Sequence, residues 1–443
     1  MAKSFKFLVI AFMLWSISIV SVLGSVISNA PLPANAMSRW KNGAIKIAVS
    51  GSLLKQNPNM KADSDAAGAV ARSLATWAKA ADVSFRDGVS DKQNVSPSGN
   101  HGDGVSLITI AATPENLLLF SKNPQETAAT TRVFFDRRGF ITEADIVLNP
   151  YQQFSTDGTF GTFDLESTLT HEIGHLLGLD HSSVLSATMH GNYGKNGVLG
   201  LHNFVPRTLA EIDISAIRAK YGSISEQVEE CCGSAGGKII GPNGRAAKTV
   251  QVWAEEAETG KLSAETVTGT DGGFKFEGLK SGDYNIYAQR TLGANIRIPA
   301  QEIGKATIDT AETTIATKKL TAAASDFQFQ YLGFNGQLSG LAVPLSAGRT
   351  YTVYLGGKDF DKDSISIAFN SPFLTVSPKT IANVDFGGEI SAVSFEIRVD
   401  PLTPVGEYSV IAETDNSGRA AIVGGIAVRI SANPFSNLTL ASE

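Results

Sequence analysis

Residues 171–181 read HEIGHLLGLDH, and this stretch decides the fold of the first half of the chain. On a helix, His171 and His175 are four residues apart, so their imidazoles project from the same face. Gly178 lets the chain leave that helix through a left-handed turn, which can bring His181 round as a third nitrogen ligand. The stretch therefore predicts a helix that ends at a glycine and carries a metal site.

Three histidines and one glutamate specify the chemistry of this predicted site. Three neutral imidazoles leave the fourth coordination position of a zinc ion for water, which distinguishes a catalytic zinc from a structural one. Glu172 lies beside the ligands as the natural general base, placed to take a proton from that water while the metal polarises a carbonyl. Histidine accounts for only 6 of 443 residues, so the whole pattern is rare by chance. We expect one catalytic zinc ion.

The pattern around this motif predicts an α+β domain over residues 37–222. Apolar residues recur with helical spacing in three segments, residues 62–81, 164–176 and 209–221. Asp63 or Ser64 is the expected N-cap of the first helix. Short apolar or alternating runs bounded by turn residues predict strands at residues 83–85, 105–110, 132–135 and 144–148.

Beyond the zinc run, the sequence resembles the matrixins, a family of metzincin metalloproteases. Ser182 directly follows the third histidine, and Met189 resembles the family's Met-turn methionine, which forms an apolar floor beneath the metal. Tyr193 matches the tyrosine that lines the main specificity pocket, and Asp213 falls where the closing helix supports the Met-turn. The resemblance covers most of residues 38–222. It implies a metzincin catalytic domain, with a twisted mixed sheet and three helices, that cleaves proteins or peptides.

The sequence also departs from the matrixin pattern. Gly191 stands where the family usually has proline, and no PRCGxPD-like segment provides cysteine-switch latency. His101 precedes a predicted strand rather than following it, so we interpret it as a loop residue and not as part of a structural zinc site. His190 and His202 are interpreted as surface or cleft-rim residues. Calcium is common in the family, but no calcium-binding loop can be mapped here.

In this family, a peptide substrate lies antiparallel along an exposed edge strand of the sheet, held by main-chain hydrogen bonds. Strand order makes the segment at residues 131–135 the candidate edge. The resemblance thus implies protein or peptide substrates.

The chain after residue 233 is predicted to be all-β, with regular turn signals and alternating apolar residues. After a linker at residues 223–233, residues 234–318 resemble a carboxypeptidase regulatory-like β-sandwich. Residues 325–432 resemble an immunoglobulin-like β-sandwich, and residues 433–443 form a tail. Both modules are interpreted as spacers or stabilising domains, with contacts to polymers, partners or the cell surface as the alternative. Trp253 is either an exposed contact residue or part of a domain interface.

Charge and cysteine content exclude some classes of function. The chain has 37 basic and 43 acidic residues and no basic block, which argues against nucleic acid as a partner. Two cysteines cannot build a disulfide framework or a cysteine-based zinc site. Cys231 and Cys232 are adjacent, and a vicinal disulfide, an intermolecular bridge and two free thiols all remain open.

The first residues predict a targeting segment. Two lysines precede an uncharged apolar run at residues 7–24, and small residues follow. This is typical of a signal peptide, assigned to residues 1–30, with cleavage possible after Gly24, Ala30 or Ala36. We expect a secreted, extracellular protein. A periplasmic location and an uncleaved membrane anchor are the alternatives.

Together these patterns predict a secreted zinc endopeptidase that hydrolyses internal peptide bonds with a glutamate-activated, zinc-bound water. One rival is a catalytically silent metzincin-fold binding protein, which the intact Glu172 argues against. The other rival is a zinc hydrolase of a non-peptide amide. The sequence does not indicate an oligomeric state.

Overall fold

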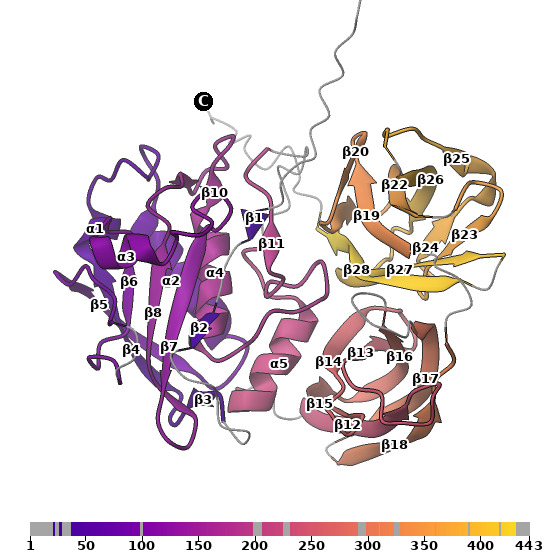
Figure 1. Ribbon diagram of the computed structural model, residues 1–443, viewed down its shortest axis with the longest axis horizontal. Coiled ribbons are helices and arrows are strands. Elements are labelled where there is room, and N and C mark those ends of the chain that lie inside the picture. The colour runs from indigo at the N-terminus through magenta and orange to yellow at the C-terminus, as the bar shows by residue number, and fades with distance from the viewer. Residues whose placement is uncertain are drawn as a thin grey trace, which may run out of the picture.

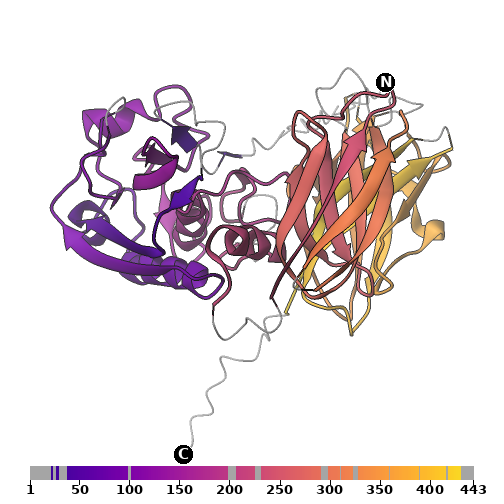
Figure 2. The same cartoon turned by 90° about the horizontal axis from the view of Figure 1, so that it is seen from below.

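The computed structural model consists of an N-terminal α+β domain and two β-domains that lie on the same flank of it (Figures 1 and 2). It describes residues 21–22, 26–28, 37–97, 101–197, 206–224, 231–290, 298–309, 311–322, 328–358, 360–388, 390–415 and 418–430. Most of the predicted signal peptide and the tail at residues 433–443 therefore lie outside the described residues. Within the described ranges, no helix is both long and apolar enough to cross a membrane.

The N-terminal domain is built on a mixed sheet, as the matrixin resemblance implies. Its strands, in spatial order, are β2 (Val26–Ser28), β7 (Ala129–Phe135), β8 (Phe140–Leu148), β6 (Leu107–Thr109), β4 (Ala44–Ser50) and β5 (Ser84–Ser90), with β3 (Arg39–Trp40) also paired to β8. Only the β7–β8 pair is antiparallel among the pairs of this sheet. The sequence analysis missed β4, although its isoleucines alternate with polar and small residues as in a half-buried strand.

Three longer helices accompany this sheet, near the predicted positions: α2 (Ala66–Ala78), α4 (Leu165–Leu176) and α5 (Glu211–Tyr221). Two short ones were not predicted, α1 (Gly51–Leu54) and α3 (Pro114–Leu118). The predicted N-cap of the first helix was wrong. Asp65 accepts a 2.8 Å hydrogen bond from the backbone N–H of Gly68, whereas Asp63 has a φ of 66° and belongs to the preceding turn.

The hydrophobic core fixes α4 between α2 and the sheet. Trp77 of α2 is fully buried, and its indole Nε1 donates a 2.8 Å hydrogen bond to the carbonyl of Thr170 on α4. Leu169 and Ile173 of α4 belong to the same core as Ile146 of β8. The helix that carries the zinc motif is therefore anchored from two sides. Small strands outside the main sheet are β1 (Ser21–Val22), β9 (Phe154–Ser155), β10 (Phe163–Asp164) and β11 (Asn192–Tyr193).

The first β-domain consists of two sheets around an apolar core. One sheet has three strands, β15 (Gly273–Lys280), β12 (Cys231–Ile240) and β18 (Glu312–Lys319). The other has four, β14 (Leu262–Val267), β13 (Gln251–Glu256), β16 (Gly282–Arg290) and β17 (Ile298–Ile308). Strand β12 begins at Cys231, inside the stretch expected to be linker. Cys231 and Cys232 form a vicinal disulfide, one of the three open alternatives.

The second β-domain is also a two-sheet structure. Its larger sheet contains β20 (Gln337–Ser339), β19 (Gln328–Phe334), β22 (Thr350–Lys358), β26 (Ser391–Val399), β24 (Leu374–Val376) and β25 (Ala382–Asn383). Its smaller sheet contains β21 (Val343–Ser346), β28 (Arg419–Arg429), β27 (Gly406–Thr414) and β23 (Ile365–Ala368). A short 3₁₀ helix lies at Pro378–Thr380.

Trp77 provides a test of this core. Replacing a fully buried tryptophan with alanine leaves a cavity, so Trp77→Ala should lower the free energy of unfolding of the N-terminal domain by about 3–5 kcal/mol. Urea unfolding followed by far-ultraviolet circular dichroism measures the change. Val89→Ala is the control, because Val89 is 75% exposed on β5. Equal unfolding midpoints for the two variants would contradict the proposed role of Trp77.

Candidate metal centre

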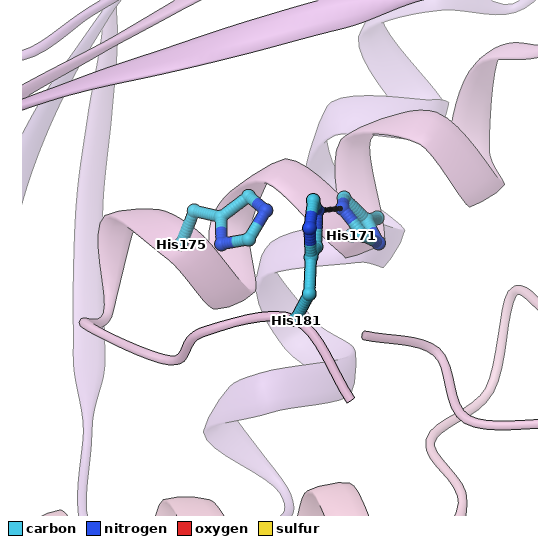
Figure 3. Close-up of side chains that lie close together, drawn as sticks. All are labelled: His171, His175 and His181. Carbon is cyan, nitrogen blue, oxygen red and sulfur yellow. Dashed lines mark hydrogen bonds between the residues drawn. The ribbon is translucent and has the colours of Figure 1, made fainter. Parts of the chain in front are cut away.

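Helix α4 and the turn after it bring three histidines together (Figure 3). One ring nitrogen from each of His171, His175 and His181 lies within 4.8 Å of the others. Gly178 has a φ of 90°, as predicted, and a β-carbon at this position would lie 1.9 Å from the carbonyl oxygen of Ser38. Only glycine fits this turn, which returns the chain toward the helix and places His181 opposite its two partners.

Backbone carbonyls orient two of the imidazoles. Nδ1 of His171 lies 2.7 Å from the oxygen of Thr188, and Nδ1 of His175 lies 2.8 Å from the oxygen of Leu179. A carbonyl can only accept, so each Nδ1 carries the proton and each Nε2 presents its lone pair. The Nε2 atoms of His171 and His181 are 3.3 Å apart. Tetrahedral zinc with Zn–N bonds of about 2.0–2.1 Å separates its nitrogens by about 3.3 Å.

Burial keeps these ligands neutral. It lowers the pKa of His175 to about 3, and it lowers the pKa of His171 and of His181 below the ordinary histidine value. Nε2 of His175 is buried and has no hydrogen-bond partner among the described residues. A buried lone pair without a donor is costly unless a cation occupies the position it faces. The donor set therefore fits a zinc ion.

Glu172 is fully buried beside the histidines. Its Oε2 accepts a 2.5 Å hydrogen bond from Oγ1 of Thr131 on β7, whereas Oε1 has no partner within the described part of the chain. Burial raises the pKa of Glu172 to about 8, and the bond from Thr131 opposes that rise. A divalent cation nearby would favour the carboxylate form. Sequence reasoning missed Thr131, since nothing in a β-strand pattern marks one threonine as the partner of a distant carboxylate.

Met189 lies directly against α4. It is 2% exposed, and a β-carbon on Gly174 would lie 2.2 Å from its sulfur. Gly174 therefore provides the space in which the methionine packs under the helix. Asp213 of α5 holds this turn, because its carboxylate accepts backbone N–H bonds from Thr188 at 2.8 Å and from Met189 at 3.2 Å. Burial raises the pKa of Asp213 to about 7, against the effect of these bonds.

The other residues considered from the sequence are not among the three histidines of this cluster. His101 is exposed, and His202 lies outside the described residues. His190 is half-buried, with Nδ1 3.2 Å from the carbonyl of Ser182. The backbone of Tyr193 lies in β11, but its side chain is outside the described residues, so its pocket role stays a prediction. The structure explains a small residue at position 191, because a β-carbon on Gly191 would lie 3.1 Å from Nδ1 of His181.

The candidate substrate edge is partly covered by the chain itself. Strand β2 pairs with the outer edge of β7 in the parallel direction, with Val26 opposite Thr131 and Ser28 opposite Val133. Strand β1 pairs antiparallel with β11, just after the Met-turn. Strand β1 thus lies beside β11 (Figure 1), and strand β2 lies beside β7. The sequence predicts only a leader for this segment.

Comparisons with known proteins agree with this geometry for the N-terminal domain. Residues 39–222 match the family model described as matrixin. Metalloendoproteinase 1 of Glycine max is 30% identical over 195 residues, which cover 42% of this chain and 53% of the relative. The chain therefore spans about half the length of this curated relative.

Solved structures similar to the chain add little. The major pilin subunit BcpA of Bacillus cereus covers 43% of this chain and 66% of its own, with 12% identity and a TM-score of 0.18. A putative adhesin from Bacteroides ovatus covers 48% of this chain and 93% of its own, with 11% identity and a TM-score of 0.18. These TM-scores are too low to support a conclusion about the β-domains.

Asp213 provides a test of the Met-turn. In Asp213→Asn, the amide NH₂ replaces one of the two accepting oxygens and faces a backbone N–H, so the free energy of unfolding should fall by about 1–3 kcal/mol. Chemical denaturation measures the loss. Asp82→Asn is the control, because Asp82 is exposed and remote from the turn. A stability equal to that of the control would show that the N–H bonds from Thr188 and Met189 to Asp213 do not matter.

Proposed function

We propose that this protein is an exported zinc endopeptidase that hydrolyses internal peptide bonds of proteins. The observation that carries the proposal is the convergence of two buried imidazoles and one exposed imidazole beside a buried glutamate, inside a region that matches the matrixin family. The apolar run at residues 7–24, after two lysines, supports export through a signal peptide.

His171, His175 and His181 would hold the zinc ion through their Nε2 atoms. Bound zinc supplies Lewis acidity toward the scissile carbonyl and the attacking water. Glu172 takes the proton from that water as it attacks and passes it to the leaving amine, which is general acid–base catalysis by one carboxyl group. Thr131 holds one carboxylate oxygen, which leaves Oε1 for the proton transfer.

The substrate would be an extended peptide that adds to the outer edge of β7. Main-chain hydrogen bonds to a sheet edge hold any sequence in register, so the edge gives affinity without strong side-chain selection. Thr131 belongs to β7 and also contacts Glu172, so the edge delivers a peptide next to the general base. Since β2 covers Thr131 to Val133, the substrate has to replace residues 26–28 in any chain that keeps them after export.

Glu172→Gln is the direct test of the chemistry. The amide cannot accept a proton at neutral pH, so kcat on a quenched peptide mixture should fall by about 10²–10⁴-fold. Zinc content, measured by atomic absorption, should stay at one ion per chain, because the three histidines are intact.

Two controls accompany this variant. Glu115→Gln alters an exposed carboxylate on α3 and should retain full activity. Removing the metal with a chelator should abolish cleavage, and added zinc should restore it. Undiminished cleavage by Glu172→Gln would exclude its role as general base. A folded, zinc-loaded wild type that cleaves no peptide would favour a binding protein or a hydrolase of non-peptide amides.

The leader segment provides a second test. A chain that begins at Met37 exposes the edge of β7, whereas a chain that begins at Ser21 retains both β1 and β2. We expect a higher kcat/KM for the shorter chain, because the substrate no longer competes with residues 26–28. A synthetic peptide of residues 20–30 should inhibit the shorter chain competitively. Equal kcat/KM values and no inhibition would show that the pairing does not restrict access.

A further inference from the structure

The loop between the third histidine and Met189 is docked on both β-domains. Val184 and Ala187 of this loop are fully buried in one apolar cluster with Trp253 of β13 and Val423 of β28. Trp253 is therefore part of a domain interface and not an exposed contact residue. The backbone N–H of Leu185 donates a 3.1 Å hydrogen bond to the carbonyl of Val423. The loop lies where all three domains meet.

Gly424 shows how closely the second β-domain approaches this loop. Its φ is 66°, and a β-carbon there would lie 2.3 Å from Cγ1 of Val184 and 2.5 Å from Oγ of Ser186. Any larger residue would push the loop away.

A single carboxylate from the first β-domain holds the residues next to the metal ligand. Oε2 of Glu265, on β14, accepts a 2.6 Å hydrogen bond from Oγ of Ser182. Its Oε1 accepts from Oγ of Ser183 and, at 3.0 Å, from Nε2 of Gln251. Bonds to an ionised acceptor are the strong ones among hydrogen bonds. Glu265 and His181 also line the same cleft between the two domains.

The second β-domain supports the metal centre indirectly, by holding the start of helix α5. The buried carboxylate of Glu407 accepts a hydrogen bond from the backbone N–H of Glu211, the first residue of α5, and pairs with Arg429 at 2.9 Å. Asp213, two residues further along α5, holds the Met-turn. The helix and the loop that shape the metal centre are thus each held by the β-domains.

His181 needs this support more than the other two histidines do. His171 and His175 lie on α4, inside the core, and carbonyls fix their rings. His181 follows the end of the helix, so the path of its own loop decides its position. The residue after it, Ser182, donates its backbone N–H to the carbonyl of Met189 at 2.8 Å and its hydroxyl to Glu265.

We propose that Glu265 is a positioning residue of the metal centre. It sets the place of His181 through Ser182 and Ser183, so the two β-domains are part of the zinc site and not spacers. The inference rests on the proposed zinc site, but it concerns residues outside the N-terminal domain.

The test compares zinc affinity among full-length variants. Removing a group that orients a ligand typically weakens metal binding by about 10–100-fold. Glu265→Ala should therefore raise the zinc dissociation constant, measured by competition with a chromogenic chelator, by about that factor. Glu265→Gln keeps one acceptor oxygen and should give a smaller rise. The visible spectrum of the cobalt(II)-loaded Glu265→Ala protein should also change, because d–d bands report ligand geometry.

Matched variants separate positioning from general loss of structure. Glu258→Ala removes an exposed carboxylate of the same domain that does not line this cleft, and it should leave zinc affinity unchanged. Ser182→Ala should weaken zinc binding, and the double variant with Glu265→Ala should be no weaker than the poorer single one. Circular dichroism checks that each variant is folded.

The outcomes distinguish this inference from the proposed function. If the wild type binds zinc and Glu265→Ala binds it equally well with the same cobalt spectrum, the positioning role is wrong and the protease proposal stands. If the folded wild type binds no zinc, the protease proposal itself fails. Weaker zinc binding by Glu265→Ala, with additive losses when Ser182 and Ser183 are both replaced by alanine as well, would mean that Glu265 acts by a route other than these two serines, and this too would overturn the inference.

Discussion

The N–H···O=C bonds from Nδ1 of His171 and His175 are the constraint on which the rest of the site depends. They fix both the proton and the direction of the free lone pair on each ring. The accepting carbonyls belong to Thr188 and Leu179, in the two segments that flank His181. The same backbone that orients the first two ligands therefore also determines where the third one lies.

This arrangement makes the metal centre sensitive to distant packing. Gly174 admits Met189 against the helix, and Asp213 holds the Met-turn through backbone N–H groups. Thr188, whose N–H binds Asp213, also provides the carbonyl that orients the imidazole of His171. Because protein interiors are close-packed, a shift of α5 or of the loop would be transmitted to the ligands instead of being absorbed.

The two β-domains also support the metal centre, from outside the N-terminal domain. The three domains meet at the loop that connects the last histidine to the methionine. Val184 of this loop packs against Gly424 of the second β-domain, and Glu265 of the first β-domain binds the start of the loop. Burial of this loop against neighbouring domains removes conformations in which His181 would lie away from its partners. The candidate metal centre at this junction combines histidines from one domain with supporting contacts from the other two.

The sequence by itself determined the helix of the zinc motif, its end at Gly178 and the change to all-β structure after residue 233. These features depend on local periodicity and backbone conformation, which neighbouring residues dictate. Only the tertiary structure showed that Thr131 contacts Glu172, that residues 26–28 pair with β7, and that Glu265 binds the ligand loop. Each joins residues about 40 to 100 positions apart, and no local pattern encodes such contacts because they arise only when separate elements pack together.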